Sequence, residues 1–283
     1  MCDVATSGTT IRLRTGGQGP ALLLLHGYPQ THVLWHKIAP RLSERFTVVA
    51  ADLRGYGASG KPATDATHSP YSKRAMALDM AEVMTTLGHD QFFVGAHDRG
   101  ARVAHRLGLD HAARVRKIAT LDIAPTREMY KNTTDAFARA YWHWFFLITP
   151  APFPERMIGA DPDAYWLKKC GAGSAGLTPF SAEALDHYLQ AFRDPATIHA
   201  SCEDYRAGAT IDIAHDDADG AKKLDCPLLA LWGENGIIGK CFDPLALWRE
   251  RASQVSGYAL PGGHYLAEEV PELVAKAFED FFV

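Results

Sequence analysis

The chain has 283 residues, of which 47 % are hydrophobic and 22 % are charged, and its formal net charge is −4 without any basic block. A chain of this size buries a large core unaided, and this charge pattern argues against nucleic acid as a partner. Its five scattered cysteines form no CxxC pair, which argues against a disulfide framework and a zinc site. Because the N-terminus lacks the apolar core of a signal peptide and no apolar run could span a membrane, we expect a cytoplasmic protein without membrane contact.

Along the chain, short apolar runs alternate with amphipathic stretches, a pattern typical of a parallel sheet wrapped by helices. The expected strands cover residues 21–25, 46–52, 92–97, 117–123, 228–232 and 257–260, and the clearest helices cover residues 71–87, 99–110 and 271–282.

The alternation stops between residues 125 and 220, where the chain is aromatic, helical and interrupted by prolines. Open α/β sheets bind their ligands at the carboxyl ends of the strands. We therefore expect a core of residues 1–124 and 221–283, with residues 125–220 inserted as a helical lid over that edge.

The segment FFVGAHDRGA, residues 92–101, leads from an expected strand into an expected helix. A sharp strand-to-helix turn that exposes one side chain tolerates only small residues two positions to either side, as in the GxSxG motif. Here Ala96 and Gly100 are the small residues, and Asp98 takes the position of the serine. Alternatively, Asp98 only caps the helix that follows.

A carboxylate at this position changes the chemistry. Asp98 is ionised at neutral pH without help from a base, so it can attack a carbon that carries a leaving group and form an ester. Hydrolysis of that ester then needs a histidine to activate water. His264 lies in PGGHYL, between the last expected strand and the last helix, and is the expected base.

The acidic partner of His264 is either Asp122 or Glu234. Asp122 ends an apolar strand, where an uncompensated carboxylate is costly, so a histidine partner would account for it. Glu234 follows the next strand and stays an alternative. The oxyanion hole is expected from the backbone N–H groups of Arg99 and Tyr28.

Two arginines follow the nucleophile. Arg99 and Arg102 are three residues apart and share a face of a helix whose N-terminus already favours anions. Together they are expected to form a bidentate clamp for a substrate carboxylate and to lower the pKa of Asp98. Alternatively, they form ion pairs with acidic residues of the lid or the sheet.

Four segments of this chain resemble the corresponding segments of fluoroacetate dehalogenases, and the similarity extends over nearly the whole chain. They are HGYPQTHVLWH at residues 26–36, HDRGARV at 97–103, YWHW at 141–144 and CEDYRAG at 202–208. The DRGAR run is the most specific, whereas the loop around Gly27 is shared with epoxide hydrolases. This resemblance implies the α/β-hydrolase fold, hydrolysis of a haloacetate, and no metal or organic cofactor. It also suggests a homodimer.

The resemblance implies a role for each matching residue. Asp98 would be the nucleophile, His264 the base and Asp122 its partner, and Arg99 and Arg102 would hold the substrate carboxylate. From the lid, His143, Trp144 and Tyr205 would donate hydrogen bonds to the departing halide. Their imidazole, indole and phenol groups are donors that an apolar pocket can hold, although each could instead belong to the core of the lid.

Two departures from the family pattern concern the size of the pocket. Position 28 is usually phenylalanine and is Tyr28 here, which adds a hydroxyl group near the pocket. The lid usually supplies a bulky aromatic residue near residues 170–174, which read CGAGS in this chain. We therefore expect a roomier pocket that accepts larger 2-halo acids.

Other functions suit parts of the pattern. An epoxide hydrolase would use the same triad, with Tyr205 and Tyr141 as lid tyrosines, and a haloalkane dehalogenase has similar chemistry. Neither needs Arg99 and Arg102 to bind an anion. A catalytically silent receptor would keep the lid but lose a catalytic residue.

Overall fold

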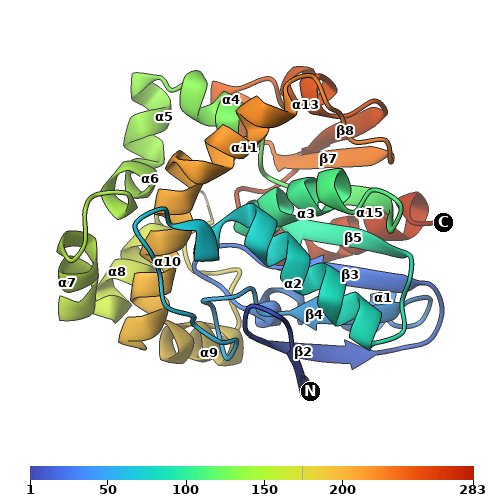
Figure 1. The fold of residues 1–283 in the computed structure, drawn as a ribbon, viewed down its shortest axis with the longest axis horizontal. Coiled ribbons are helices and arrows are strands. Elements are labelled where there is room, and N and C mark those ends of the chain that lie inside the picture. Colours follow the sequence, from blue (N-terminus) through green and yellow to red (C-terminus); the bar gives the residue numbers. More distant parts are fainter. Residues whose placement is uncertain (174) are drawn as a thin grey trace.

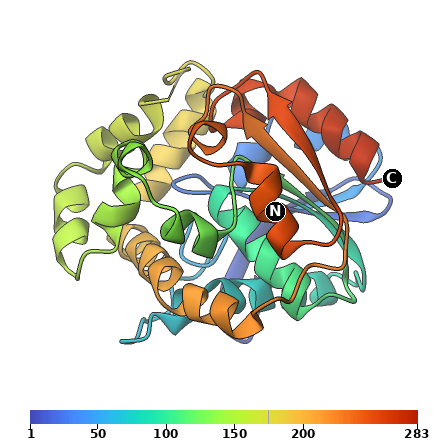
Figure 2. The ribbon, with the colours of Figure 1, turned by 90° about the horizontal axis from the view of Figure 1, so that it is seen from above.

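The computed structural model describes residues 1–173 and 175–283, which form a twisted sheet with helices on both faces and a block of helices at one end (Figures 1 and 2). Within these residues the sheet has eight strands in the order β1-β2-β4-β3-β5-β6-β7-β8, parallel from β4 to β8. The strands are β1 Cys2–Ala5, β2 Thr10–Gly16, β3 Ala21–Leu25, β4 Thr47–Ala51, β5 Phe92–His97, β6 Val115–Leu121, β7 Leu228–Gly233 and β8 Val255–Leu260.

The helices of the core flank this sheet. They are η1 His32–Trp35, α1 Ala39–Leu42, η2 Ser69–Tyr71, α2 Lys73–Thr86, α3 Asp98–Asp110, α12 Ile238–Cys241, α13 Pro244–Arg251, α14 Leu266–Glu269 and α15 Pro271–Phe281. No helix in the described part of the chain is both long and apolar enough to cross a membrane.

The central strands are buried on both faces, which explains their continuous apolar sequences. In β3, whose sequence is ALLLL, every residue is buried. Leu23 and Leu25 join the core that includes Met80 of α2, whereas Leu22 and Leu24 join the core that includes Phe278 of α15. The expected α/β-hydrolase fold, with helices on both faces of a mostly parallel sheet, is confirmed.

The first two strands were not expected. β1 and β2 pair antiparallel with each other, and β2 pairs antiparallel with β4. In β2 only Ile11 and Leu13 are fully buried, between polar and exposed neighbours. An edge hairpin of this kind has no long apolar run, so its sequence resembles that of a loop.

Between β6 and β7, residues 126–219 supply helices that gather beyond one end of the sheet, at the left of Figure 1. They are α4 Thr126–Lys131, α5 Asp135–Ala140, α6 Trp142–Leu147, α7 Phe153–Ala160, α8 Pro162–Gly171, α9 Ala182–Phe192, α10 Pro195–Ala209 and α11 Ile211–Asp219. We propose that residues 125–220 act as the lid, because α6 and α10 contact Tyr28 after β3, and Tyr141, at the N-cap of α6, contacts His264 after β8.

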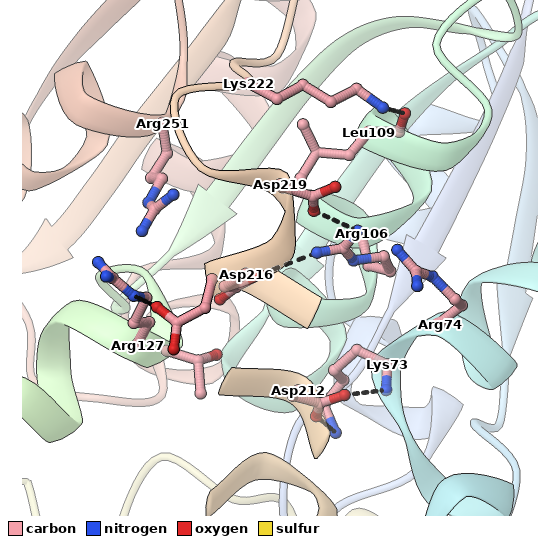
Figure 3. A network of polar contacts seen from close by, with 12 residues as sticks. Lys73, Arg74, Arg106, Leu109, Arg127, Asp212, Asp216, Asp219, Lys222 and Arg251 are labelled. Atoms are coloured by element: carbon pink, nitrogen blue, oxygen red, sulfur yellow. Dashed lines mark hydrogen bonds and ion pairs between the residues drawn. The ribbon is translucent and has the colours of Figure 1, made fainter. Parts of the chain in front are cut away.

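Ion pairs join α11, the last helix of the proposed lid, to the core helices α2 and α3. On α11, Asp212 contacts Lys73 of α2, and Asp216 accepts a hydrogen bond of 2.9 Å from Arg106 of α3 (Figure 3). Asp219 Oδ2 also lies 2.6 Å from Arg106 Nη1. Arg106 is therefore a structural residue that joins α3 to α11.

Candidate active site

Asp98 stands at the turn between β5 and α3. Its φ of 43° is in the left-handed region, which is uncommon for residues other than glycine. Backbone strain of this kind is found most often at functional sites. A Cβ atom on Gly27 would lie 2.5 Å from the Asp98 Cβ, and one on Gly100 would lie 2.4 Å from the carbonyl oxygen of His26. Glycine is therefore required at both positions for the loop, strand and helix to approach each other.

The Asp98 carboxylate does not cap α3. The residue at the N-cap is His97, which makes no side-chain capping bond, and Asp98 Oδ1 instead accepts a hydrogen bond of 2.9 Å from the Tyr28 backbone N–H. That N–H group is the Tyr28 half of the expected oxyanion hole. The contribution of the Arg99 backbone N–H stays a prediction.

His264 follows β8, and its Nδ1 lies 2.7 Å from Asp122 Oδ2. Asp122 is completely buried directly after β6, which ends at Leu121 rather than at residue 123, and its φ of 50° is left-handed. Its other oxygen accepts a hydrogen bond of 3.0 Å from the backbone N–H of Gly233. Glu234 is exposed, so the geometry favours Asp122 as the partner of His264.

Opposing effects act on the ionisation of Asp98. Burial raises the pKa of the carboxyl group, but the nearby His264 and Arg102 outweigh burial and hold this pKa below its ordinary value of 3.8. His97 itself stays neutral, because burial and the neighbouring His264 lower its pKa to about 3. Its Nε2 is 2.9 Å from the His264 carbonyl oxygen, which orients the loop that carries the base.

Arg99 forms the ion pair that the sequence left open as an alternative. Its Nε donates to Asp204 Oδ2 at 2.9 Å and its Nη2 to Asp204 Oδ1 at 2.7 Å, and both side chains are fully buried. The guanidinium also lies 4.1 Å from the centre of the Tyr205 ring. The Nε and Nη2 groups of Arg99 are therefore bound by Asp204 of α10. Its Nη1 group has no partner in the described residues and is free to bind a ligand.

Arg102 has no carboxylate partner among the described residues. Its Nη1 donates to Thr126 Oγ1 at 2.9 Å, its Cζ lies 4.7 Å from the centre of the Trp144 ring, and its Nε has no partner. The expected clamp for a substrate carboxylate therefore has fewer free N–H groups than two unpaired guanidinium groups would offer. Arg102 therefore contributes a positive charge near Asp98 that no carboxylate of the described residues pairs.

The three expected halide donors come together from two lid helices. His143 and Trp144 are on α6 and Tyr205 is on α10, and the Tyr205 ring centre lies 5.9 Å from that of His143 and 6.3 Å from that of Trp144. Trp144 Nε1 and Tyr205 Oη are buried and have no hydrogen-bond partner in the described residues. Buried donors without partners are costly, so both are suited to a ligand that accepts hydrogen bonds.

A model of the α/β-hydrolase fold matches residues 20–269, most of the chain. The chain belongs to the α/β-hydrolase family. A fluoroacetate dehalogenase from Burkholderia sp is 45 % identical over 280 residues, which cover 98 % of this chain and 92 % of that protein. A soluble epoxide hydrolase from Corynebacterium sp. (strain C12) is 32 % identical over 283 residues, which cover 98 % and 94 %.

Among solved structures, a provisionally assigned α/β-hydrolase from Nostoc sp PCC 7120 has a TM-score of 0.97 and 57 % identity. The match covers 100 % of this chain and 97 % of that one. The epoxide hydrolase CorEH has a TM-score of 0.91 and 30 % identity, with coverage of 99 % and 97 %. The expected resemblance of this α/β-hydrolase to fluoroacetate dehalogenases is confirmed.

Sequence reasoning missed Lys169, which α8 brings to the active site of this α/β-hydrolase. Its Nζ donates to Tyr265 Oη at 2.9 Å and to the Tyr28 carbonyl oxygen at 3.2 Å, and its charge helps to lower the pKa of Asp98. No motif marks Lys169. Its position directly before the unusual segment 170–174 is the one signal that could have drawn attention to it.

The two positions that depart from the family pattern have different environments. The Tyr28 hydroxyl donates to Tyr165 Oη of α8 at 3.0 Å, so it joins the loop after β3 to the lid. Cys170 is buried against Tyr265, whereas Ala172 and Gly173 are exposed. Ser174 lies outside the described residues. The expectation of a roomier pocket stays a prediction.

One group of side chains in this α/β-hydrolase has the spacing of a metal site, namely Glu155, His199 and Glu203. The guanidinium of Arg206 lies between the two carboxylates, with Nη1 2.7 Å from an oxygen of each. Arg206 therefore joins the two carboxylates and offsets part of their negative charge, as in a structural ion-pair cluster.

Proposed function

We propose that this enzyme hydrolyses the carbon–halogen bond of a haloacetate through an ester on Asp98. The observation that carries the proposal is an ionised, buried carboxylate that lies close to an unpaired arginine and to buried donors without partners. Such a site suits a small substrate with an anionic group and a hydrogen-bond-accepting leaving group. The 45 % identity to a fluoroacetate dehalogenase supports fluoroacetate as a substrate.

In the first step, an oxygen of Asp98 attacks the carbon that carries the halogen. Because Oδ1 is held by the Tyr28 N–H group, Oδ2 is the oxygen free to attack. A new C–O bond forms, and the carbon–halogen bond breaks with its electron pair leaving on the halide. Arg99 Nη1 and Arg102 hold the substrate carboxylate, while His143, Trp144 and Tyr205 donate hydrogen bonds to the halide.

In the second step, His264 removes a proton from a water molecule, which attacks the carboxyl carbon of the Asp98 ester. Negative charge develops on Oδ1, where the Tyr28 N–H group stabilises it. Asp122 accepts a hydrogen bond from His264 Nδ1 and so stabilises the imidazolium. The ester bond then breaks, and the alkoxide takes the proton from His264. The sum is fluoroacetate and water giving glycolate, fluoride and a proton.

Epoxide hydrolysis is the second candidate, because Tyr141 and Tyr205 are both buried next to the triad and a relative is a soluble epoxide hydrolase. A neutral epoxide, however, leaves the Arg102 charge unpaired in the pocket. A silent receptor would not need the contact of 2.7 Å between His264 and Asp122.

Product analysis separates these functions. The enzyme is incubated with fluoroacetate, chloroacetate and styrene oxide, and halide and diol are measured. Halide release from the acids alone supports the proposal, whereas formation of diol alone contradicts it. Turnover of 2-halopropionates tests the proposed roomier pocket, and confinement to haloacetates would contradict it. The cytoplasmic location and the homodimer stay predictions that these products do not address.

A further inference from the structure

A second cluster of buried charges lies behind Arg99 and takes no direct part in the proposed chemistry. Its centre is Asp204 of α10, whose side chain is completely buried. Besides the two bonds from Arg99, Asp204 Oδ2 accepts a hydrogen bond of 2.6 Å from the Tyr56 hydroxyl, and Oδ1 is paired with Lys73 Nζ. Arg99 Nη2 also donates to the Asp204 backbone oxygen at 2.6 Å.

These contacts determine how Arg99 is presented to the pocket. Three of its hydrogen bonds go to Asp204, so the guanidinium plane is fixed, and Nη1 has no partner in the part of the chain that the structure describes. A Cβ atom on Gly208, one turn further along α10, would lie 3.0 Å from Arg99 Nη2, so the absence of a side chain there makes room for the guanidinium.

Asp204 is itself held from the core side. Lys73 begins α2 and contacts both Asp204 of α10 and Asp212 of α11, the latter at 3.6 Å between Nζ and Oδ2. The Lys73 backbone N–H also donates to Asp212 Oδ1 at 2.8 Å (Figure 3). Lys73 of α2 therefore binds the carboxylate that orients Arg99 and is itself bound by Asp212 of α11.

The next residue after Asp204 is Tyr205, which carries one of the proposed halide donors. Arg99 lies 4.1 Å from the centre of the Tyr205 ring, so α10 fixes both the arginine for the carboxylate and a donor for the halide. This one helix therefore sets the spacing between Arg99 and the Tyr205 donor.

We propose that Asp204 is a positioning residue, which acts through Arg99 to aim Nη1 at the substrate carboxylate. This inference rests on the proposed function for the identity of the substrate, but the geometry of Arg99 can be tested without turnover. The probe is acetate, the substrate analogue without a halogen, and the readout is its dissociation constant from an NMR titration.

The test is a double-mutant cycle between Arg99→Lys and Asp204→Asn. Each single variant should weaken acetate binding roughly tenfold, as expected for loss of one charge-assisted hydrogen bond. In the Arg99→Lys background, Asp204→Asn should add little, because both changes remove the same contact. Additive effects, unchanged binding, or tighter binding through an unmasked positive charge would each overturn the proposal.

Two further variants keep the test decisive. Glu203→Gln is the matched control, because Glu203 is a buried carboxylate on the same helix that is paired with Arg206 and His68 rather than with Arg99. It should lower the melting temperature without changing the dissociation constant of acetate. If Asp204→Asn does not fold, Tyr56→Phe takes its place in the cycle with a smaller effect in the same direction, and an additive cycle overturns the proposal.

The outcomes separate this inference from the proposed function. Wild-type enzyme that releases fluoride, with acetate binding that does not depend on Asp204, refutes the positioning role alone. Wild-type enzyme that releases no halide from any acid refutes the proposed function. The titration still decides whether Asp204 acts through Arg99.

Discussion

At the scale of single residues, the charges around Asp98 determine how its reaction depends on pH. Its pKa lies below 3.8, since His264 and Arg102 outweigh the effect of burial. A lowered pKa means that the carboxylate is ionised at every pH above the ordinary range for aspartate and is protonated only in stronger acid.

Ester formation should therefore be nearly independent of pH between about pH 5 and pH 8. The measurement is the rate of the halide burst in Asp122→Asn, in which the second step is slowed while His264 is kept. A rate that falls as the pH decreases from 8 to 5 would show that a different group must lose its proton before attack.

Asp122→Asn should slow hydrolysis of the ester far more than its formation, because Asp122 supports the imidazolium of His264 and does not contact the reacting carbon. By analogy with other catalytic triads, kcat should fall about a thousandfold or more, with a burst of halide before the slow phase. Glu234→Gln is the control and should leave kcat unchanged. If Glu234→Gln has the larger effect, the assignment of the triad is wrong.

At the scale of elements, the proposed mechanism makes α6 and α10 decide which halide can leave. Trp144 and Tyr205 carry buried N–H and O–H groups that have no partner among the described residues, so in this proposal their hydrogen bonds form when the leaving group is present. Fluoride needs this stabilisation most, because it is the poorest leaving group among the halides.

Tyr205→Phe should consequently lower kcat for fluoroacetate roughly ten- to hundredfold, and for bromoacetate by much less, since a charge-assisted hydrogen bond is lost at an unchanged ring. The informative quantity is the ratio of the two rates, measured as halide release. An equal loss with both substrates would indicate that Tyr205 supports the lid rather than the leaving group. Tyr28→Phe, which removes a hydroxyl bonded to Tyr165, should leave this ratio unchanged.

At the scale of the whole molecule, buried neutral histidines make stability depend on pH. Burial lowers the pKa of His97 and of His105 to about 3, and those of His26 and His143 are lowered too. The unfolded chain thus binds more protons than the folded protein below the ordinary value of 6.5, so acid destabilises the fold. Asp216, whose pKa burial raises to about 6, acts in the opposite direction but is a single group.

We expect the melting temperature to be lower at about pH 5 than at about pH 7.5. Thermal unfolding followed by circular dichroism at both values checks this. A melting temperature that is equal or higher at the lower pH would mean that these histidines are protonated in the folded state.

Sequence predicted most of the fold, and it predicted that Asp98, Asp122 and His264 lie together, for a physical reason. The turn at Asp98 and the loop at His264 depend on local backbone geometry, which leaves a local signature of small residues and strand ends. The pairing of Arg99 with Asp204 joins residues 105 positions apart and depends on how α10 packs against α3. Lys169 and the edge hairpin β1–β2 likewise leave no local signature, so sequence reasoning could not assign them.

The most direct test of the account is the identity of the group that forms the covalent intermediate. His264→Ala is incubated with fluoroacetate, digested and examined by peptide mass spectrometry, with Asp98→Asn as the control. We predict release of one fluoride per protein molecule and one added glycolyl unit on Asp98. Fluoride release without an adduct, or an adduct on another residue, would contradict the two-step mechanism on Asp98.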